Sequence, residues 1–114
     1  GFRSTSASLR IYALEILLKV FVCRKLDLPL LPSACKTHNL EEVLLFTGLT
    51  KELQEPSRAS IRQSWDILVD YSKKQLNDQR YQPRSTFSSA EADQIDHALD
   101  DPNLGVLAWL LNRP

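Results

Sequence analysis

The most constraining feature of the sequence is an apolar stretch near its beginning, SLRIYALEILLKVFVCRKL, at residues 8–26. At about 100° per residue, the stretch predicts an α-helix with two apolar faces and one narrow polar stripe. The first face holds Leu9, Ala13, Ile16, Val20 and Cys23, the second holds Leu14, Leu17, Leu18 and Phe21, and the stripe holds Ser8, Glu15 and Lys19. Helices with so little polar surface are usually covered on two sides. We therefore expect another chain, or a segment preceding residue 1, to cover one face.

Capping and turn signals divide the remaining sequence into shorter helices. The first expected segments are a helix from Ser6 or Ser8 to Leu26, a loop at 27–36, a helix capped by Thr37 or Asn39 and ended by Gly48, and a short turn or loose helical piece at 49–56. They are followed by a helix at 57–75, a loop at 76–87, a helix from Ser88 to Leu99, and a last helix opened by Asp101 and Pro102. Leu45, Phe46, Trp65 and Trp109 are expected in the core. No strand pattern occurs. The predicted fold class is all-α, an up-and-down bundle of four to five helices in one domain over residues 1–114.

Composition excludes several classes of protein. Hydrophobic residues make up 43% of the chain and charged residues 25%, as in folded globular domains. Two cysteines and two histidines at scattered positions provide neither a disulfide framework nor metal-ligand spacing, so we expect a reducing, cytoplasmic setting without metal or cofactor. The apolar run from Ile11 to Val22 is interrupted by Glu15 and Lys19 and is well short of the about 20 residues of a bilayer span, so no membrane partner is expected.

Charge is unevenly distributed although the formal net charge is zero. Residues 1–87 carry 13 lysines and arginines against 9 acidic residues, and residues 88–114 carry 1 against 5. The mildly basic larger part permits an anionic partner, but the bias is far weaker than the footprint of a dedicated nucleic-acid binder. Scattered, solvated charges are the simpler interpretation.

Three pieces of the sequence, in this order, resemble the HEPN (higher eukaryote and prokaryote nucleotide-binding) superfamily. They are YALEILLKVFVCRKL, KTHNLEEVLLFTGL, and SWDILVDYS followed by the pair Arg80 and Tyr81. The resemblance is greatest to small bacterial members with a helix close to YALE-x-x-LK and a THDLE-like helix start. It covers roughly residues 8–84 and extends loosely to GVLAWL near the C-terminus.

The resemblance implies an up-and-down helical bundle that forms a dimer with a groove along the dimer axis. Many members are metal-independent ribonucleases in toxin–antitoxin or defence systems, and others bind RNA or nucleotides without cleaving them. Such members usually carry another helix before YALE, so we expect an upstream helix to be absent from this chain. The catalytic members have an Arg separated from a His by four to six residues. Neither His38 nor His97 has an Arg at those distances, so this motif is missing.

Four residues near the first two expected helices are candidate ligand-binding residues. Glu15 and Lys19 have the i, i+4 spacing of a helical ion pair, and Glu15 is also suited to positioning a ligand or a catalytic histidine. The alternative is a solvated or interface-satisfied pair. Lys36 and His38 lie at a helix start, where the cation and the helix N–H groups favour a phosphate and the imidazole is a weak candidate for an acid or base. The alternative for His38 is a structural hydrogen bond.

A basic and aromatic patch follows the third expected helix. Arg80, Tyr81 and Arg84 combine two groups able to bind phosphate with a ring able to stack on a base. The alternative is a loop held against the bundle by Tyr81, with both arginines solvated.

Three functions follow from the sequence. The first is a HEPN-like domain that dimerises and binds RNA or a nucleotide, without the usual ribonuclease motif. The second is a protein–protein interaction or dimerisation module, in which the first helix is the docking surface. The third is a ribonuclease with a non-standard site built from His38 and Arg80. The position of Glu15 and Lys19 distinguishes the first function from the second. If the two residues face a hydrated groove, ligand binding is favoured. If they only border an apolar interface, the interaction module is favoured.

Overall fold

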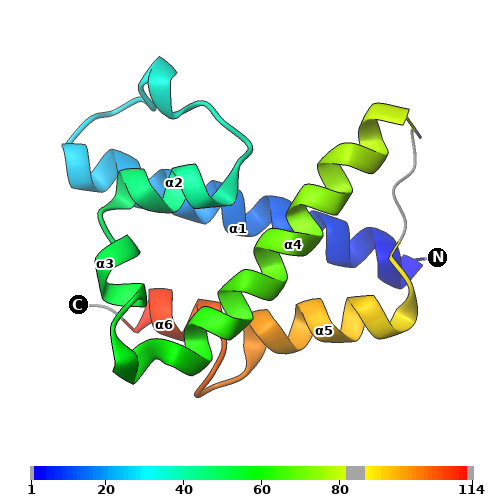
Figure 1. The fold of residues 1–114 in the computed structure, drawn as a ribbon. Coiled ribbons are helices and arrows are strands. Elements are labelled where there is room, and N and C mark those ends of the chain that lie inside the picture. The colour runs from blue at the N-terminus through cyan, green and yellow to red at the C-terminus, as the bar shows by residue number, and fades with distance from the viewer. Residues whose placement is uncertain (1, 82–86, 113–114) are drawn as a thin grey trace.

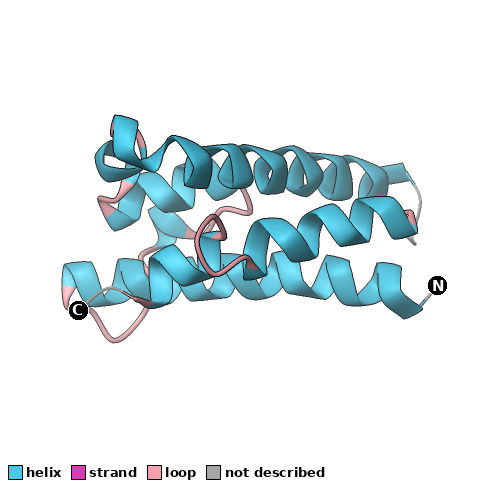
Figure 2. Ribbon diagram, turned by 90° about the horizontal axis from the view of Figure 1, so that it is seen from below, coloured by secondary structure: helices cyan, strands magenta, loops and turns pink. Residues whose placement is uncertain are grey.

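The computed structural model describes residues 2–81 and 87–112, with only the backbone described for residues 2–6, 34 and 77–81. Within these residues the chain is all-α, as the sequence predicts (Figures 1 and 2). The helices are α1 (Phe2–Leu26), α2 (Leu40–Thr47), α3 (Thr50–Leu53), α4 (Ala59–Tyr81), α5 (Ser89–Asp100) and α6 (Val106–Leu111), with 3₁₀ turns η1 (Ser33–Cys35) and η2 (Pro56–Arg58). No helix in this part of the chain has the length and hydropathy to cross a membrane.

The helices form a flat body measuring 38 × 33 × 19 Å. Because one helix with its side chains is about 10–12 Å across, the shortest dimension corresponds to two layers. The long helix α1 contacts α2, α4 and α5, and α6 completes the far side by packing against α4 and α5. In Figure 1, α4 crosses in front of α1 while α2 and α5 lie on either side of the crossing. Helix α1 is therefore the element that most of the others share.

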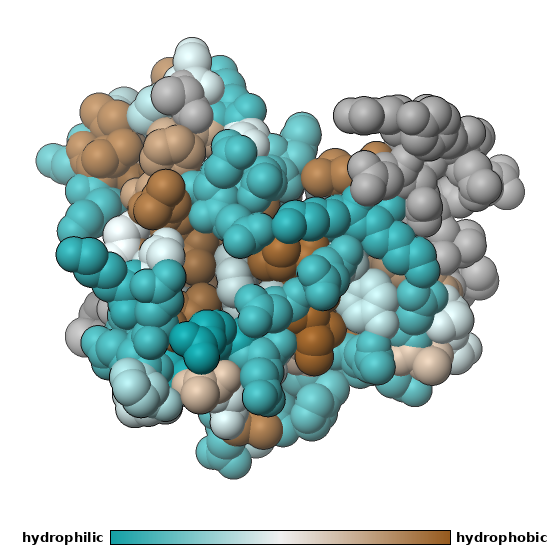
Figure 3. Space-filling view, in the orientation of Figure 1, coloured by the Kyte–Doolittle hydropathy of each residue, from teal (hydrophilic) through white to brown (hydrophobic). Residues whose placement is uncertain are grey.

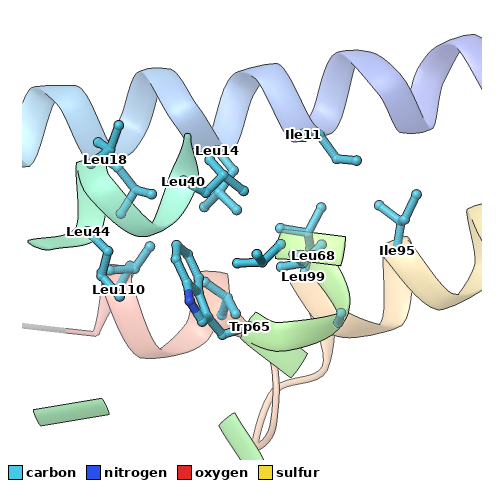
Figure 4. Close-up of a cluster of buried hydrophobic side chains, with 14 of the residues drawn as sticks. Ile11, Leu14, Leu18, Leu40, Leu44, Trp65, Leu68, Ile95, Leu99 and Leu110 are labelled. Carbon is cyan, nitrogen blue, oxygen red and sulfur yellow. The ribbon is translucent and has the colours of Figure 1, made fainter. Parts of the chain in front are cut away.

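The core is built on one face of α1. Ile11, Leu14, Leu18 and Val22 recur at helical spacing and are fully buried. Figure 4 shows the first three pointing toward side chains from four other helices. Those partners are Leu40 and Leu44 of α2, Trp65 and Leu68 of α4, Ile95 and Leu99 of α5, and Leu110 of α6. Each such side chain contributes about 1.5–3 kcal/mol through burial, so this face supplies much of the stabilisation. The expected burial of Trp65 and Trp109 is confirmed.

Local capping signals give most of the helix ends correctly. The Asn39 side chain accepts hydrogen bonds from the backbone N–H groups of Glu41 and Glu42 and so begins α2. Gly48 ends that helix with φ of 79°, a left-handed conformation that favours glycine. Ser88 and Glu91 form a reciprocal capping box at the start of α5. These interactions involve neighbours in sequence, which is why the sequence predicts them.

Two helices extend beyond their expected ends. Helix α1 begins at Phe2 rather than near Ser6 or Ser8, because Ala7 is buried in the core and tertiary packing continues the helix past both serines. Helix α4 continues to Tyr81, so the prediction of a loop from residue 76 is wrong for residues 76–81. No proline or glycine occurs there, and Gln75 is buried one residue earlier.

Other side chains and one helix start differ from expectation. Leu45 and Phe46 are exposed, since Val43, Leu44 and Thr47 occupy the inward face of α2 instead. Asp101 does not open the last helix. Its carboxylate accepts hydrogen bonds from the backbone N–H groups of Asn103 and Leu104, two and three residues later, and so closes a turn.

The last helix begins after Gly105. A Cβ atom at this position would lie 2.6 Å from the carbonyl oxygen of Leu99 and 2.5 Å from that of Asp101. The chain returns so closely over the end of α5 that only glycine fits. This close approach, and not the Asp101–Pro102 pair, determines where α6 starts.

The capping box gives a direct test of this description. Replacing Ser88 by Ala removes the acceptor for the Glu91 N–H and should lower the free energy of unfolding by about 1 kcal/mol. The matched control is Ser89→Ala, which removes an exposed hydroxyl one residue later. Urea unfolding of both variants measures the difference. Equal stabilities of the two variants would contradict the assignment of Ser88 as the cap.

Candidate functional site

The centre of the candidate site is Glu15, a carboxylate on α1 that is only 7% exposed. A buried carboxylate is costly unless it is paired and hydrogen-bonded. Two partners satisfy the same oxygen, Oε2: Lys19 Nζ at 3.0 Å and His38 Nδ1 at 3.0 Å. Lys19 lies one helical turn away on α1, and His38 comes from the segment just before α2. The structure thus brings together three of the residues that the sequence singles out.

Glu15 fixes one nitrogen of the His38 ring. With the carboxylate ionised, Nδ1 carries a proton and donates it to Oε2, so Nε2 is the remaining acceptor of the neutral ring. The His38 side chain is 66% exposed and is therefore accessible to a ligand, whereas the carboxylate beneath it is not. A buried acid that orients an exposed imidazole is an arrangement suited to hydrogen-bonding or exchanging a proton with a polar ligand.

The second feature of the site is an apolar face on the outside of α1. Leu9 is 61% exposed, Ile16 62% and Val20 41%, and Ala13 between them is also exposed. With the half-buried Cys23, these residues are separated by alternating steps of four and three. This is the spacing that keeps a stripe facing a second helix in a coiled coil. We call these five residues the outer face of α1, and it is the first of the two apolar faces that the sequence predicts.

The outer face deepens into a groove at the C-terminal end of α1. The cavity measures about 470 Å³ and lies between α1 and the following loop. It is lined by Ile16, Lys19, Val20, Cys23, Arg24, Asp27, Leu28 and Pro29. Leu26 and Leu30 are also exposed here, and Figure 3 shows hydrophobic side chains gathered over this end of α1 and its loop. Lys19 therefore joins the two features, since it pairs with Glu15 and also borders an apolar groove.

Of the other predicted site residues, the structure describes the side chain of Lys36 but not those of Arg80, Tyr81 and Arg84. Lys36 is exposed, ends η1, and precedes His38 by two residues, with no ion pair to the described residues. Arg80 and Tyr81 are the last residues of α4, and their side chains lie outside the description, as does all of Arg84. Lys73 of α4 and Glu41 at the start of α2 form an exposed ion pair of 3.1 Å, so the later part of α4 lies near the start of α2.

Sequence reasoning missed an ionic cluster beside the N-terminal part of α1. Arg10 Nη1 lies 2.8 Å from Asp96 Oδ1 and 2.8 Å from Asp100 Oδ2, and Arg10 also pairs with Asp100 through Nη2. The two aspartates look like a solvated acidic face in the sequence. Their partner is 86 and 90 residues away, so no local signal reveals the contact.

The cluster changes the ionisation of both partners. The hydrogen bond from Arg10 lowers the pKa of Asp100, against a smaller opposing effect of burial. The same hydrogen bond is the main cause of the raised pKa of Arg10. Arg10 therefore remains charged, but its charge is neutralised on the body of the protein.

Comparison with known proteins gives no relatives: no protein-family model, no curated protein and no solved structure matches the chain.

The Arg10 cluster predicts how stability depends on pH. A folded-state pKa below the unfolded value gives stability above about pH 4 that is lost as the pH falls through the folded pKa. Asp100→Asn should therefore unfold more easily than the natural chain at pH 7, and the difference should shrink toward pH 2. Urea unfolding across pH measures it. Asp66→Asn, which changes an exposed carboxylate of α4, is the control. A difference for Asp100→Asn that stays constant over this range would contradict the assignment.

Proposed function

We propose that this chain is a HEPN-like up-and-down helical domain that forms a homodimer through the outer face of α1 and binds RNA or a nucleotide beside that interface. The observation that carries the proposal is the exposure of the outer face, a continuous apolar stripe on a 25-residue helix. An apolar stripe of this kind is a recognised mark of an association surface. The family assignment itself rests on the sequence resemblance.

The pattern of the stripe favours a second copy of the same chain. A two-fold interface requires a surface that is complementary to itself. In an antiparallel pairing centred between Ile16 and Val20, Ile16 packs on Val20 of the second copy, and Ala13 packs on Cys23 of the second copy. Both pairs then place apolar side chains against each other, and the small side chain of Ala13 leaves room for the neighbouring helix.

The charges beside the stripe are compatible with self-association. Lys19 and Arg10 flank the outer face, and two bare cations from each copy would repel those of the other. Each is already neutralised within its own chain, Lys19 by Glu15 and Arg10 by two aspartates. The cation that remains on this surface is Arg24, which is exposed and lines the groove.

The ligand part of the proposal rests on Glu15, Lys19, Lys36 and His38. The His38 imidazole is accessible, and Lys36 lies two residues before it without a carboxylate partner among the described residues. A cation and an oriented imidazole close to a helix start are suited to a phosphate group. Arg80, Tyr81 and Arg84 extend the proposed surface on the basis of sequence.

An interaction module without RNA binding is the second candidate. Lys19 borders an apolar groove, which favours this candidate, whereas the exposed His38 on the same Glu15 oxygen favours ligand binding. Both candidates require the outer face of α1 to be covered, and they differ in whether an anionic ligand binds near His38.

The dimer can be tested with two matched variants. Ile16→Glu places a charge in the centre of the outer face and should convert a particle with the mass of two chains into one with the mass of a single chain. Leu45→Glu makes the same change at an equally exposed leucine, 63% against 62%, on α2 and should leave the mass unchanged. Light scattering at several concentrations measures the masses. A natural chain that is monomeric throughout would refute the homodimer.

RNA binding is tested separately by anisotropy with a labelled single-stranded oligouridine. Affinity should fall steeply from about 50 to 200 mM salt, since phosphate contacts release counterions. Lys36→Ala should reduce the slope of log affinity against log salt by about 1, and His38→Ala should weaken binding. Lys51→Ala, an exposed lysine of α3, should match the natural chain. A dimer that binds no oligouridine would leave the interaction module as the function.

A further inference from the structure

The imidazole of His38 has one nitrogen engaged and the other exposed. Its Nδ1 lies 3.0 Å from Oε2 of the buried Glu15 carboxylate, which makes Nδ1 the protonated nitrogen of the neutral ring. Its Nε2, on the opposite edge of the ring, forms no hydrogen bond or ion pair with the residues that the structure describes. Because the side chain is 66% exposed, the lone pair of Nε2 is accessible from solvent.

The other histidine of the chain, His97, shows that exposure alone does not create this arrangement. Its side chain is 69% exposed, nearly as much as that of His38. Its nearest described carboxylate, that of Asp101, lies 3.6 Å from Nε2, which is too far for a hydrogen bond. Nothing in the described part of the chain fixes the tautomer of His97. His38 is therefore the histidine that presents a fixed, unprotonated nitrogen to solvent.

The charges near His38 select the kind of reactant. The exposed Lys36, two residues earlier, attracts an anion. The first turn of α2 carries Glu41 and Glu42, of which Glu41 is paired with Lys73. The remaining exposed carboxylate, that of Glu42, disfavours an anion of high charge. A phosphoryl donor with a single net negative charge, as phosphoramidate has near neutral pH, fits these charges better than a polyphosphate does.

We propose that Nε2 of His38 is a phosphoryl acceptor that forms phosphohistidine with a phosphoramidate donor. Histidine is among the side chains that form such covalent intermediates. The Nε2 lone pair forms a bond to phosphorus, the P–N bond of the donor breaks, and the donor nitrogen, which already carries three protons, leaves as ammonia.

The ring becomes a phosphorylated imidazolium in this step, because Nδ1 keeps its proton. The Glu15 carboxylate is already in place against Nδ1 and stabilises the new positive charge. Glu15 is therefore a positioning residue, and it holds the ring so that Nε2, and not Nδ1, reacts. The step needs no other reactant, and it depends neither on the proposed dimer nor on RNA binding.

Incubation with potassium phosphoramidate, followed by intact-mass spectrometry and phosphorus NMR, tests the proposal. The natural chain should gain one phosphoryl group, which should be lost in acid and kept in alkali, as expected of a P–N bond. His38→Ala should abolish this modification. His97→Ala is the matched control, since it removes an equally exposed histidine, and it should react like the natural chain. No modification of His38, or equal rates at the two histidines, would overturn the proposal.

The role of Glu15 is tested by Glu15→Gln, whose carboxamide oxygen can still accept from Nδ1 but carries no charge. Phosphorylation should then be at least about tenfold slower. Glu42→Gln removes an exposed carboxylate instead and should not slow the reaction. A natural rate for Glu15→Gln would contradict the role of Glu15.

Nitrogen NMR of the natural chain gives a test that does not depend on the folding of any variant. Above the pH at which the ring loses its charge, His38 should carry its proton on Nδ1, and the phosphorylated chain should carry phosphorus on Nε2. A neutral ring protonated on Nε2, or a phosphoryl group attached to Nδ1, would overturn the proposal.

Discussion

The packing of one face of α1 against three other helices is the interaction on which the rest of the structure depends. Ile11, Leu14, Leu18 and Val22 are buried, and α2, α4 and α5 each contact α1. Helices α4 and α5 also pack against each other, and α1 joins this pair to α2. Because α1 is apolar on two sides and the core covers only one of them, the outer face remains exposed. The proposed association is thus a direct consequence of how the core is built.

The same geometry explains the position of the candidate site. Glu15 lies next to Leu14 on α1 and is buried at the boundary between the core and the surface. A carboxylate in that position needs partners, and both available partners are functional candidates. The ion pair with Lys19 holds a cation at the apolar groove, while the contact with His38 fixes the segment before α2 against α1. One buried acid therefore connects the fold, the groove and the exposed imidazole.

Sequence reasoning succeeded where the determining interactions are local. The caps at Asn39 and Ser88 and the glycine turn at Gly48 involve residues within three positions of one another. The periodicity of α1 also reveals two apolar faces, but it cannot say which of them the core covers, since that depends on helices distant in sequence. Arg10 with its two aspartates, and Gly105 against the end of α5, depend on the same long-range packing. The contact of Glu15 with His38 spans 23 residues, so the sequence suggests both residues without showing that they meet.

The central claim is that the outer face of α1 is covered in solution, and methyl-selective NMR with a soluble paramagnetic probe tests it most directly. The account predicts that, at high protein concentration, the methyl groups of Ile16 and Val20 are protected from the probe nearly as well as those of buried Leu18, and that dilution removes the protection. Leu45, equally exposed within the single chain, should stay accessible at every concentration. Full accessibility of Ile16 and Val20 at all concentrations, equal to that of Leu45, would contradict the account.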